Sequence, residues 1–308
     1  MKVLVTGGQG YIGSIVAQEL MKQNFEVEIY DLKNQQDILN EELLLSILKN
    51  KKIEAVMHFA AYIEMGESML NPTKYFENNF LGSAILINSM IKAGINKLIF
   101  SSTAGVYGNP ERVPIKEIDR KIPENPYGES KLMVEQLLDY YSRTNDFKSI
   151  SLRYFNASGA TLDKKIGENH QPESHLIPNV IKAIIQKKEF KLFGADYPTP
   201  DGTCIRDYIH VLDLANAHIL ALKALINGHK TDIYNCGTGK GYSNNQVIEM
   251  IKNVSGNNLK IKIESRRPGD ANELVADSSK LQNEFNWKPQ YSDLKTIIQS
   301  AWQWHTRQ

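Results

Sequence analysis

Tyr127 and Lys131 are residues whose types and spacing suggest chemistry, because they lie one helical turn apart in NPYGESKLMVEQ, residues 125–136. Pro126 fits the first turn of a helix. The positions that share one apolar face of this predicted helix are Tyr127, Lys131, Val134, Leu138 and Tyr141. Most isolated Tyr-x-x-x-Lys pairs are a packed phenol and a lysine whose ammonium reaches solvent. A buried ammonium can instead favour the phenolate and make a tyrosine an acid–base group.

A glycine-rich loop near the N-terminus predicts a second functional element. The apolar run KVLVTG predicts a buried parallel strand, and a helix is expected over about residues 11–22. In TGGQGYIG between them, Gly7 and Gly8 permit a tight turn. Gly10 lets the backbone approach a pyrophosphate, and Gly13 lets the helix pack against its strand. The helix N-terminus then faces the phosphates, as in dinucleotide-binding proteins.

Asp31 ends the second predicted strand, residues 26–30, and lies 18 residues beyond Gly13. An acidic side chain at this distance accepts hydrogen bonds from the adenosine ribose hydroxyls and repels a 2′-phosphate. The cofactor expected is therefore NAD in preference to NADP, although Lys33 lies nearby.

The alternation of elements predicts an α/β fold with a Rossmann-type doubly wound parallel sheet. Strands are expected at about 54–59, 97–101 and 149–154, and helices at 41–50, 73–92 and 127–146. Beyond residue 156 the rhythm breaks, with a helix near 175–187 and a short strand FKLFG. We therefore expect an NAD-binding domain over 1–156, to which the chain returns around 207–241. A smaller C-terminal α/β substrate domain is expected over 157–308.

Composition excludes several classes of partner. Lys plus Arg is 36 and Asp plus Glu is 35, with no long basic tract, so nucleic acid is not expected as a partner. No run of about 18 apolar residues predicts a membrane span or a signal peptide. Cys204 and Cys236 lack Cys-x-x-Cys spacing and are expected to be buried free thiols in a reducing, cytoplasmic compartment. The seven histidines include no His-x-x-x-His pair, so no metal site is expected, and His58 is assigned to the core.

SSTAGVYG, residues 101–108, follows a predicted strand and places Thr103 at the edge where open α/β sheets bind ligands. A glycine-rich loop, then this segment, then Tyr-x-x-x-Lys is an order that resembles the extended short-chain dehydrogenase/reductase superfamily. Within it, blocks across nearly the whole chain resemble the UDP-glucose 4-epimerase family. They are HFAAYIEMGES, ENNFLGS, PYGESKLMVEQ, LRYFNASGA, IRDYIHVLDLA and RRPGD. Related dehydratases and decarboxylases carry an acidic residue where this chain has Ala104.

The resemblance implies epimerisation at C4 of a UDP-hexose through a transient 4-keto sugar, with Tyr127 as acid and base. The implied catalytic residues are Thr103, Tyr127 and Lys131. The cofactor residues expected from the loop and the resemblance are Gly7, Gly10, Tyr11, Ile12, Gly13, Asp31, Asp37, Ile38, Phe59, Ala60, Ala61, Asn78, Tyr127, Lys131 and Phe155. The implied substrate residues are Thr103, Asn156, His175, Leu176, Lys191, Phe193, Arg206, Arg267 and Asp270.

The role of Lys131 can be expressed as an energy. A phenol with an ordinary pKa of about 10 must reach about 7 to act as a base near neutrality, which is about 4 kcal/mol. An ammonium about 4 Å away at an effective dielectric of about 20 supplies about that much, and the positive nicotinamide of NAD adds to it. We therefore expect Lys131 to lower the pKa of Tyr127.

Two departures from the family's pattern bear on the expectations. Only LKNQQ separates Asp31 from Asp37, where the family has another helix and most of a strand, so the sheet should lack one edge strand and one helix. Asn40 is expected to cap the next helix. Leu274 stands where many of these epimerases carry a tyrosine beside the sugar, which suggests a site wide enough for an N-acetyl group.

Alternatives remain open at this point. The family usually forms homodimers through two helices per subunit, here about 73–92 and 127–146. The substrate expected is UDP-glucose or UDP-galactose; a UDP-N-acetylhexosamine or a UDP-uronate is the alternative within enzymes. A non-catalytic module that senses NAD or a nucleotide sugar is the alternative from another class, although it would need no activated phenol.

Overall fold

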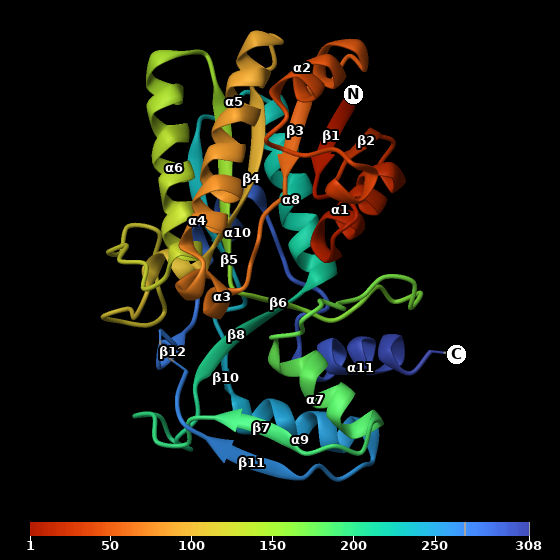
Figure 1. Cartoon of the computed structure of the whole chain (residues 1–308), viewed down its shortest axis with the longest axis vertical. Helices are drawn as coiled ribbons and strands as arrows, with labels where there is room; N and C mark the ends of the chain where they lie inside the picture. The colour runs from red at the N-terminus through yellow and green to blue at the C-terminus, as the bar shows by residue number, and fades with distance from the viewer. Residues whose placement is uncertain (268, 308) are drawn as a thin grey trace.

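The structure, a computed structural model, describes residues 1–267 and 269–307. Its N-terminal half is built on a six-stranded parallel sheet in the order β2-β1-β3-β4-β5-β9 (Figure 1). The strands are β1 (Lys2–Thr6), β2 (Glu26–Tyr30), β3 (Ala55–His58), β4 (Lys97–Thr103), β5 (Lys148–Tyr154) and β9 (Asp232–Cys236). The order reverses between β1 and β3, which confirms the predicted doubly wound sheet and puts a ligand crevice at its carboxyl edge.

Helices cover both faces of this sheet because successive strand residues point to opposite sides. Val3 and Val5 belong to a core with α1 (Tyr11–Lys22), α8 (Val211–Ile226) and α10 (Ser279–Phe285). Leu4, one position along β1, belongs to a second core on the other face. That core also contains residues of α2 (Glu41–Asn50), α5 (Gly82–Lys92) and α6 (Pro126–Thr144).

The sheet ends at β2, as the shortened sequence after Asp31 predicted. A 3₁₀ turn, Leu32–Asn34, follows β2, and no strand forms before α2 begins at Glu41. The Asn40 side chain caps α2 by accepting a hydrogen bond from the Leu43 amide at 3.0 Å. Leu44 and Leu48 of α2 are buried against the sheet, so the chain reaches its next strand without the additional edge strand and helix.

The second part of the chain lies at the carboxyl edge of the sheet (Figure 1). A small sheet has the order β10-β8-β12 with β6 beside β8, and β11 pairs with β7. These strands are β6 (Asn156–Ser158), β7 (Phe190–Phe193), β8 (Ile205–His210), β10 (Gly241–Ser243), β11 (Ile261–Glu264) and β12 (Glu273–Leu274). A third core joins α7 (Leu176–Ile185), α9 (Asn244–Ser255) and α11 (Leu294–His305). Between these elements, α8, β9 and α10 return to the large sheet.

A nearly continuous helical run lies beside α6 in Figure 1 and corresponds to the helix expected over 73–92. It consists of α4 (Pro72–Tyr75), a π-helix (Phe76–Leu81) and α5, and it follows the short α3 (Met65–Leu70). Across residues 1–267 and 269–307, no helix has the length and apolar character needed to cross a bilayer.

Candidate active site

Helix α6 places Tyr127 and Lys131 on its inward face. Asn125 caps the helix by accepting from the Gly128 amide at 2.9 Å, and Pro126 occupies the first turn. Tyr127 is 7% exposed and Lys131 is 3% exposed, so the buried stripe expected from the sequence is confirmed.

The ammonium of Lys131 has an unusual environment for a buried charge. Its Nζ donates to the Ser101 carbonyl at 2.9 Å and lies 4.9 Å from the centre of the Phe100 ring. No carboxylate of residues 1–267 or 269–307 forms an ion pair with it. Burial lowers the pKa of Lys131 to about 7, with Glu135 acting in the opposite direction. The lysine is therefore held at the carboxyl end of β4 without a carboxylate that neutralises it.

Strand β4 ends in the hydroxyl-bearing residues Ser101, Ser102 and Thr103. The Thr103 Oγ1 accepts from the Gly105 amide at 3.0 Å, which fixes this side chain at the strand end. The Ser101 hydroxyl is 2.8 Å from the hydroxyl of Tyr154, on the neighbouring strand β5. Thr103 acts to lower the pKa of Tyr127, which places these two predicted catalytic residues close together, and Lys131 is bonded to the carbonyl of Ser101 on the same strand end.

The expected lowering of the Tyr127 pKa is not found in the chain by itself. Burial raises the pKa of Tyr127 above its usual value and outweighs the hydrogen bond from Thr103. Removing the phenolate from water has a cost that opposes its ionisation, and Lys131 is not among the main groups that shift the pKa of Tyr127. The positive nicotinamide of bound NAD, also expected to favour the phenolate, would have to supply the remainder.

The glycine loop fits a dinucleotide phosphate. A Cβ built on Gly13 would lie 2.3 Å from the Gly7 carbonyl oxygen, and Gly7 itself has φ +68°. No side chain caps α1, whose cap residue is Gly10, and its first turn contains no acidic residue. The amides of Tyr11 and Ile12 are therefore at a helix N-terminus prepared for an anion.

Asp31 is fixed beside this loop at the end of β2. Its carboxylate accepts from the amides of Gln9 at 2.8 Å and Lys33 at 2.9 Å. The Lys33 ammonium donates to the Gln9 carbonyl at 3.0 Å. Asp31 therefore occupies the position from which an acidic residue meets a ribose, as predicted for a site that prefers NAD.

The remaining predicted cofactor residues gather around the same edge. Asp37 and Asn78 line a cleft of about 260 Å³ together with Leu39, Tyr62 and Lys74. Ile38 is buried, and Gly82 approaches it so closely that a Cβ there would lie 2.6 Å from its side chain.

Four further predicted residues follow the ends of β3 and β5. The Phe59 ring centre is 4.9 Å from that of His218. The Ala60 amide donates to the Thr6 hydroxyl at 3.5 Å, and Ala61 follows it in the chain. Phe155 is 6% exposed in a core with Ala104, so packing already accounts for much of its side chain.

The predicted substrate residues form two groups. Arg206 and Asp270 lie close, with Nη2 3.8 Å from Oδ1, and the Arg267 guanidinium lies 4.1 Å from the Phe193 ring centre. Lys191 projects from the same strand as Phe193 and is paired loosely with Glu264 at 3.8 Å. The second group, at the start of α7 and on β6, is His175, Leu176 and Asn156.

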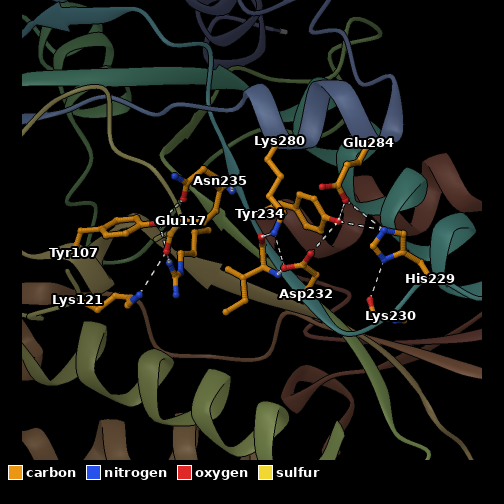
Figure 2. Close-up of polar contacts among 12 residues, drawn as sticks. Tyr107, Glu117, Lys121, His229, Lys230, Asp232, Tyr234, Asn235, Lys280 and Glu284 are labelled. Atoms are coloured by element: carbon orange, nitrogen blue, oxygen red, sulfur yellow. Dashed lines mark hydrogen bonds and ion pairs between the residues drawn. The ribbon is translucent and has the colours of Figure 1, made fainter. Parts of the chain in front are cut away.

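A buried network around Arg153 was not expected from the sequence. Arg153 Nε and Nη2 donate to the Glu135 carboxylate at 2.9 and 2.5 Å, and both side chains are 2% exposed. Arg153 Nη1 donates to the Tyr107 hydroxyl at 2.8 Å. That hydroxyl in turn donates to the Asn235 side chain at 2.6 Å (Figure 2). Glu135 lies on α6 one turn beyond Lys131, so helical spacing could have identified it as inward-facing.

Asn79 was also missed, because the sequence indicated its neighbour Asn78. The π-helix turns Asn79 inward, where it is 1% exposed. Its side chain accepts from the Tyr62 amide at 2.9 Å and donates to the Tyr62 carbonyl at 2.9 Å. Asn79 therefore fixes the segment after β3, and π-helical turns of this kind are frequent at functional sites.

The histidines have two distinct environments. His58 is 1% exposed and lies 2.6 Å from the Thr6 hydroxyl and 2.8 Å from that of Ser83, so its assignment to the core is confirmed. Burial lowers the pKa of His58 to about 3. His170 and His175 instead meet Glu168 and Glu173, a grouping that the search for His-x-x-x-His pairs did not reveal.

Both cysteines are free and buried, as expected.

Comparisons with known proteins identify the family of the chain. The sequence model of the NAD dependent epimerase/dehydratase family matches residues 3–237 of this chain. A UDP-glucose 4-epimerase of Lactobacillus helveticus is 43% identical over 99% of this chain and 97% of its own.

Solved structures give the same result. A UDP-glucose 4-epimerase from Brucella ovis, in complex with NAD, has a TM-score of 0.93 and 39% identity over 98% of this chain and 97% of its own. The UDP-Glc/GlcNAc 4-epimerase of Campylobacter jejuni has a TM-score of 0.84 and 39% identity over 99% of both chains. The chain therefore belongs to the NAD dependent epimerase/dehydratase family, among its UDP-glucose 4-epimerases.

Proposed function

We propose that this chain is an NAD-dependent epimerase that inverts C4 of a UDP-hexose and interconverts UDP-glucose and UDP-galactose. One observation carries the proposal: Lys131 is buried on the same helix face as Tyr127 and bonded to the carbonyl of Ser101, and no carboxylate in the described part of the chain pairs with it. A structural lysine would be neutralised, as Arg153 is by Glu135. A cation kept free of a counter-ion, one helical turn from a phenol, is suited to acid–base chemistry.

The chain's own groups divide the work as follows. The Tyr127 hydroxyl exchanges a proton with the sugar 4-hydroxyl, and the Thr103 hydroxyl orients the same sugar oxygen. Lys131 favours the phenolate and holds the nicotinamide ribose. When bound, NAD supplies reversible hydride acceptance, so C4 is oxidised to a ketone and reduced again with inversion.

Substrate binding is assigned to the second part of the chain. Arg206 and Arg267 are proposed to pair with the diphosphate, because planar guanidinium groups bind phosphate oxygens in pairs. Phe193 beneath Arg267 holds that guanidinium in place. Asn156 and the start of α7 are proposed to contact the uridine and the sugar.

The width of the sugar site depends on Leu274. It packs against the small core that contains Phe155 and pairs with Arg206 in the β12–β8 ladder. Leucine is smaller than tyrosine, so we propose that UDP-N-acetylglucosamine is turned over as well, more slowly than UDP-glucose. Failure of this sugar in a direct assay would reject the wider site but not the epimerase.

A cytoplasmic homodimer is proposed as the working form. The helical run from α4 to α5 and helix α6 would form the interface, with Ile91 and Tyr140 among their exposed side chains. Light scattering should give twice 34.9 kDa. A mass near that of one chain would contradict the dimer.

The deciding experiment incubates purified protein with UDP-galactose and follows UDP-glucose, with and without added NAD. Turnover in either arm is expected. The contrary result would be binding of a nucleotide sugar, detected by calorimetry, without turnover of any UDP-hexose at saturating NAD. That result would show that the chain is a sensing module and not an enzyme.

A further inference from the structure

A cluster of two glutamates and two histidines lies outside the catalytic residues, in the loop between β6 and α7. The sequence GENHQPESH, residues 167–175, contains Glu-x-His twice, as Glu168 with His170 and Glu173 with His175. One nitrogen or oxygen atom from each of the four side chains lies within 4.8 Å of the others. These side chains come from a stretch of eight residues folded back on itself, so the loop conformation itself creates the cluster.

Three of the four distances between these atoms are close to those in a tetrahedral metal shell, and the fourth is as short as a hydrogen bond. Glu168 Oε1 is 2.7 Å from His175 Nδ1 and 3.3 Å from His170 Nδ1. Glu173 Oε1 is 3.6 Å and 3.7 Å from the same two nitrogens. With zinc–nitrogen and zinc–oxygen bonds of about 2.0–2.2 Å, adjacent ligands of a tetrahedral ion are roughly 3.3–3.6 Å apart.

The Nδ1 atoms of both histidines lie close to the Glu168 carboxylate. His170 Nδ1 and His175 Nδ1 are both buried, and neither makes a hydrogen bond of acceptable geometry, although carboxylate oxygens lie nearby. Glu168 is 6% exposed. A buried imidazole nitrogen without a hydrogen bond, close to a carboxylate oxygen, is available as a ligand for an ion that both side chains could share.

The Glu173 carboxylate is held in position by the surrounding loop. It accepts from the amides of His170, Ser174 and His175 at 3.1 to 3.3 Å. The Lys182 ammonium, one turn into α7, donates to its Oε2 at 3.1 Å. Hydrogen bonds of this kind orient a metal-binding carboxylate. The Oε1 atom, which faces the histidines, accepts from the Ser174 and His175 amides, and the lysine is bonded to Oε2.

We propose that Glu168, His170, Glu173 and His175 bind one divalent transition-metal ion of the zinc class. Two imidazole nitrogens and two carboxylate oxygens suit Zn²⁺ or Co²⁺, whereas Mg²⁺ and Ca²⁺ prefer oxygen ligands alone. Four protein ligands close a tetrahedral shell and leave no position for a reacting water. The ion is therefore structural.

The position of the cluster shows what such an ion would stabilise. The His170 ring meets the ring of Tyr11 edge-on at 6.4 Å, and the Tyr11 hydroxyl donates to the Gly159 carbonyl at 2.6 Å. Tyr11 belongs to the glycine loop, and His175 leads directly into Leu176 and α7. The ion would stabilise the loop over residues 159–175, which connects the cofactor loop with the start of the substrate region.

The test titrates the full chain, freed of metal by dialysis against a chelator, with ZnCl₂ in a calorimeter. One equivalent should bind with submicromolar affinity, MgCl₂ should give no binding, and the melting temperature should rise with zinc concentration. His170→Asn and Glu168→Gln should each weaken zinc binding by about 100-fold or more. Co²⁺ should give the intense visible absorption of a tetrahedral site.

A matched control separates this site from ordinary histidine binding. His229→Asn removes a histidine that also lies beside a glutamate, Glu284, at 3.4 Å (Figure 2), and zinc binding should be unchanged. Absence of zinc binding by the wild type would show an ion-pair cluster only and overturn the proposal. Equal affinity in the wild type and both cluster variants would also overturn it. If the variants do not fold, the wild-type titration and cobalt spectrum decide, since a weak octahedral spectrum rejects the site.

Discussion

Two buried cations beside α6 differ in what surrounds them. The Arg153 guanidinium is bonded twice to the Glu135 carboxylate and once to Tyr107, and its pKa is raised above its usual value, chiefly by Glu135 against the effect of burial. The Lys131 ammonium has the Ser101 carbonyl and the Phe100 ring, and its pKa falls to about 7 through burial.

The difference shows how one helix supports both stability and chemistry. A buried ion pair with all its hydrogen bonds satisfied fixes geometry, and removing one partner is costly. A buried cation without a counter-ion lowers stability but is available to a neighbouring group. Arg153 therefore belongs to the scaffold between α6 and β5, and Lys131 belongs to the active site.

The largest effect is expected at the reacting group. Tyr127→Phe removes the acid–base hydroxyl and keeps the ring, so turnover of UDP-galactose should fall by about a thousandfold or more. The circular dichroism spectrum and the binding of NAD should be retained. Activity within tenfold of the wild type would show that Tyr127 does not transfer the proton.

The next largest effect is expected on stability, when Arg153 loses its carboxylate partner. Glu135→Gln leaves the Arg153 charge uncompensated in the interior, so the free energy of unfolding in urea should fall by about 3–5 kcal/mol. Glu135→Leu combined with Arg153→Met should recover most of that loss. The exposed pair of Glu111 and Arg120, 3.7 Å apart, supplies the control, since Glu111→Gln should cost less than about 0.5 kcal/mol.

Lys131→Met should give the opposite combination of effects. Turnover should fall by about a hundredfold because the phenolate loses its cation, while the free energy of unfolding stays the same or rises by about 1 kcal/mol because a buried charge is removed. Lys148→Met, on the exposed end of β5, should change neither quantity. A destabilisation by Lys131→Met as large as that of Glu135→Gln would erase the distinction between the two cations.

The sequence predicts one of these environments better than the other, for a physical reason. The inward face with Tyr127 and Lys131 follows from helical periodicity, which is local, and the strand before Thr103 is a continuous apolar run. The pairing of Glu135 with Arg153 joins residues from different elements, so no periodicity specifies it. The π-helical turn that places Asn79 inward depends on packing around it in the same way.

The glutamate–histidine cluster in the loop after β6 also depends on tertiary structure, although part of it is visible in the sequence. The proximity of Glu168 and Glu173 depends on how the loop folds back, which composition does not determine. A repeated Glu-x-His pattern is nevertheless present, and a search limited to histidines one helical turn apart overlooked it. The pKa of Tyr127 shows a limit of another kind, because the cost of burial cannot be weighed before the depth of burial is known.

The smallest expected effect concerns a third kind of buried basic group, which loses its charge. Burial lowers the pKa of His58 to about 3 and those of His210 and His218 to about 4. The unfolded chain binds protons at these side chains below about pH 6.5, and the folded chain does not, so their contribution to stability is present above that pH. It is lost as the pH falls toward 4, by up to about 1.4 kcal/mol per pH unit for each group.

His218→Phe provides the sharpest version of this test. His218 packs against Phe59 and Tyr154, and its Nε2 has no hydrogen-bond partner among the described residues. A phenyl ring keeps this packing and loses only the bond from Nδ1 to the Leu214 carbonyl, 2.9 Å long. Between pH 7 and pH 5, the free energy of unfolding of the variant should fall less steeply than that of the wild type, because one of three histidine contributions to the slope is removed. The half-exposed His229, replaced by Asn, should leave the slope as it was. An unchanged slope in His218→Phe would mean that this histidine is protonated inside the fold, and buried bases would then keep their charge here with or without a partner.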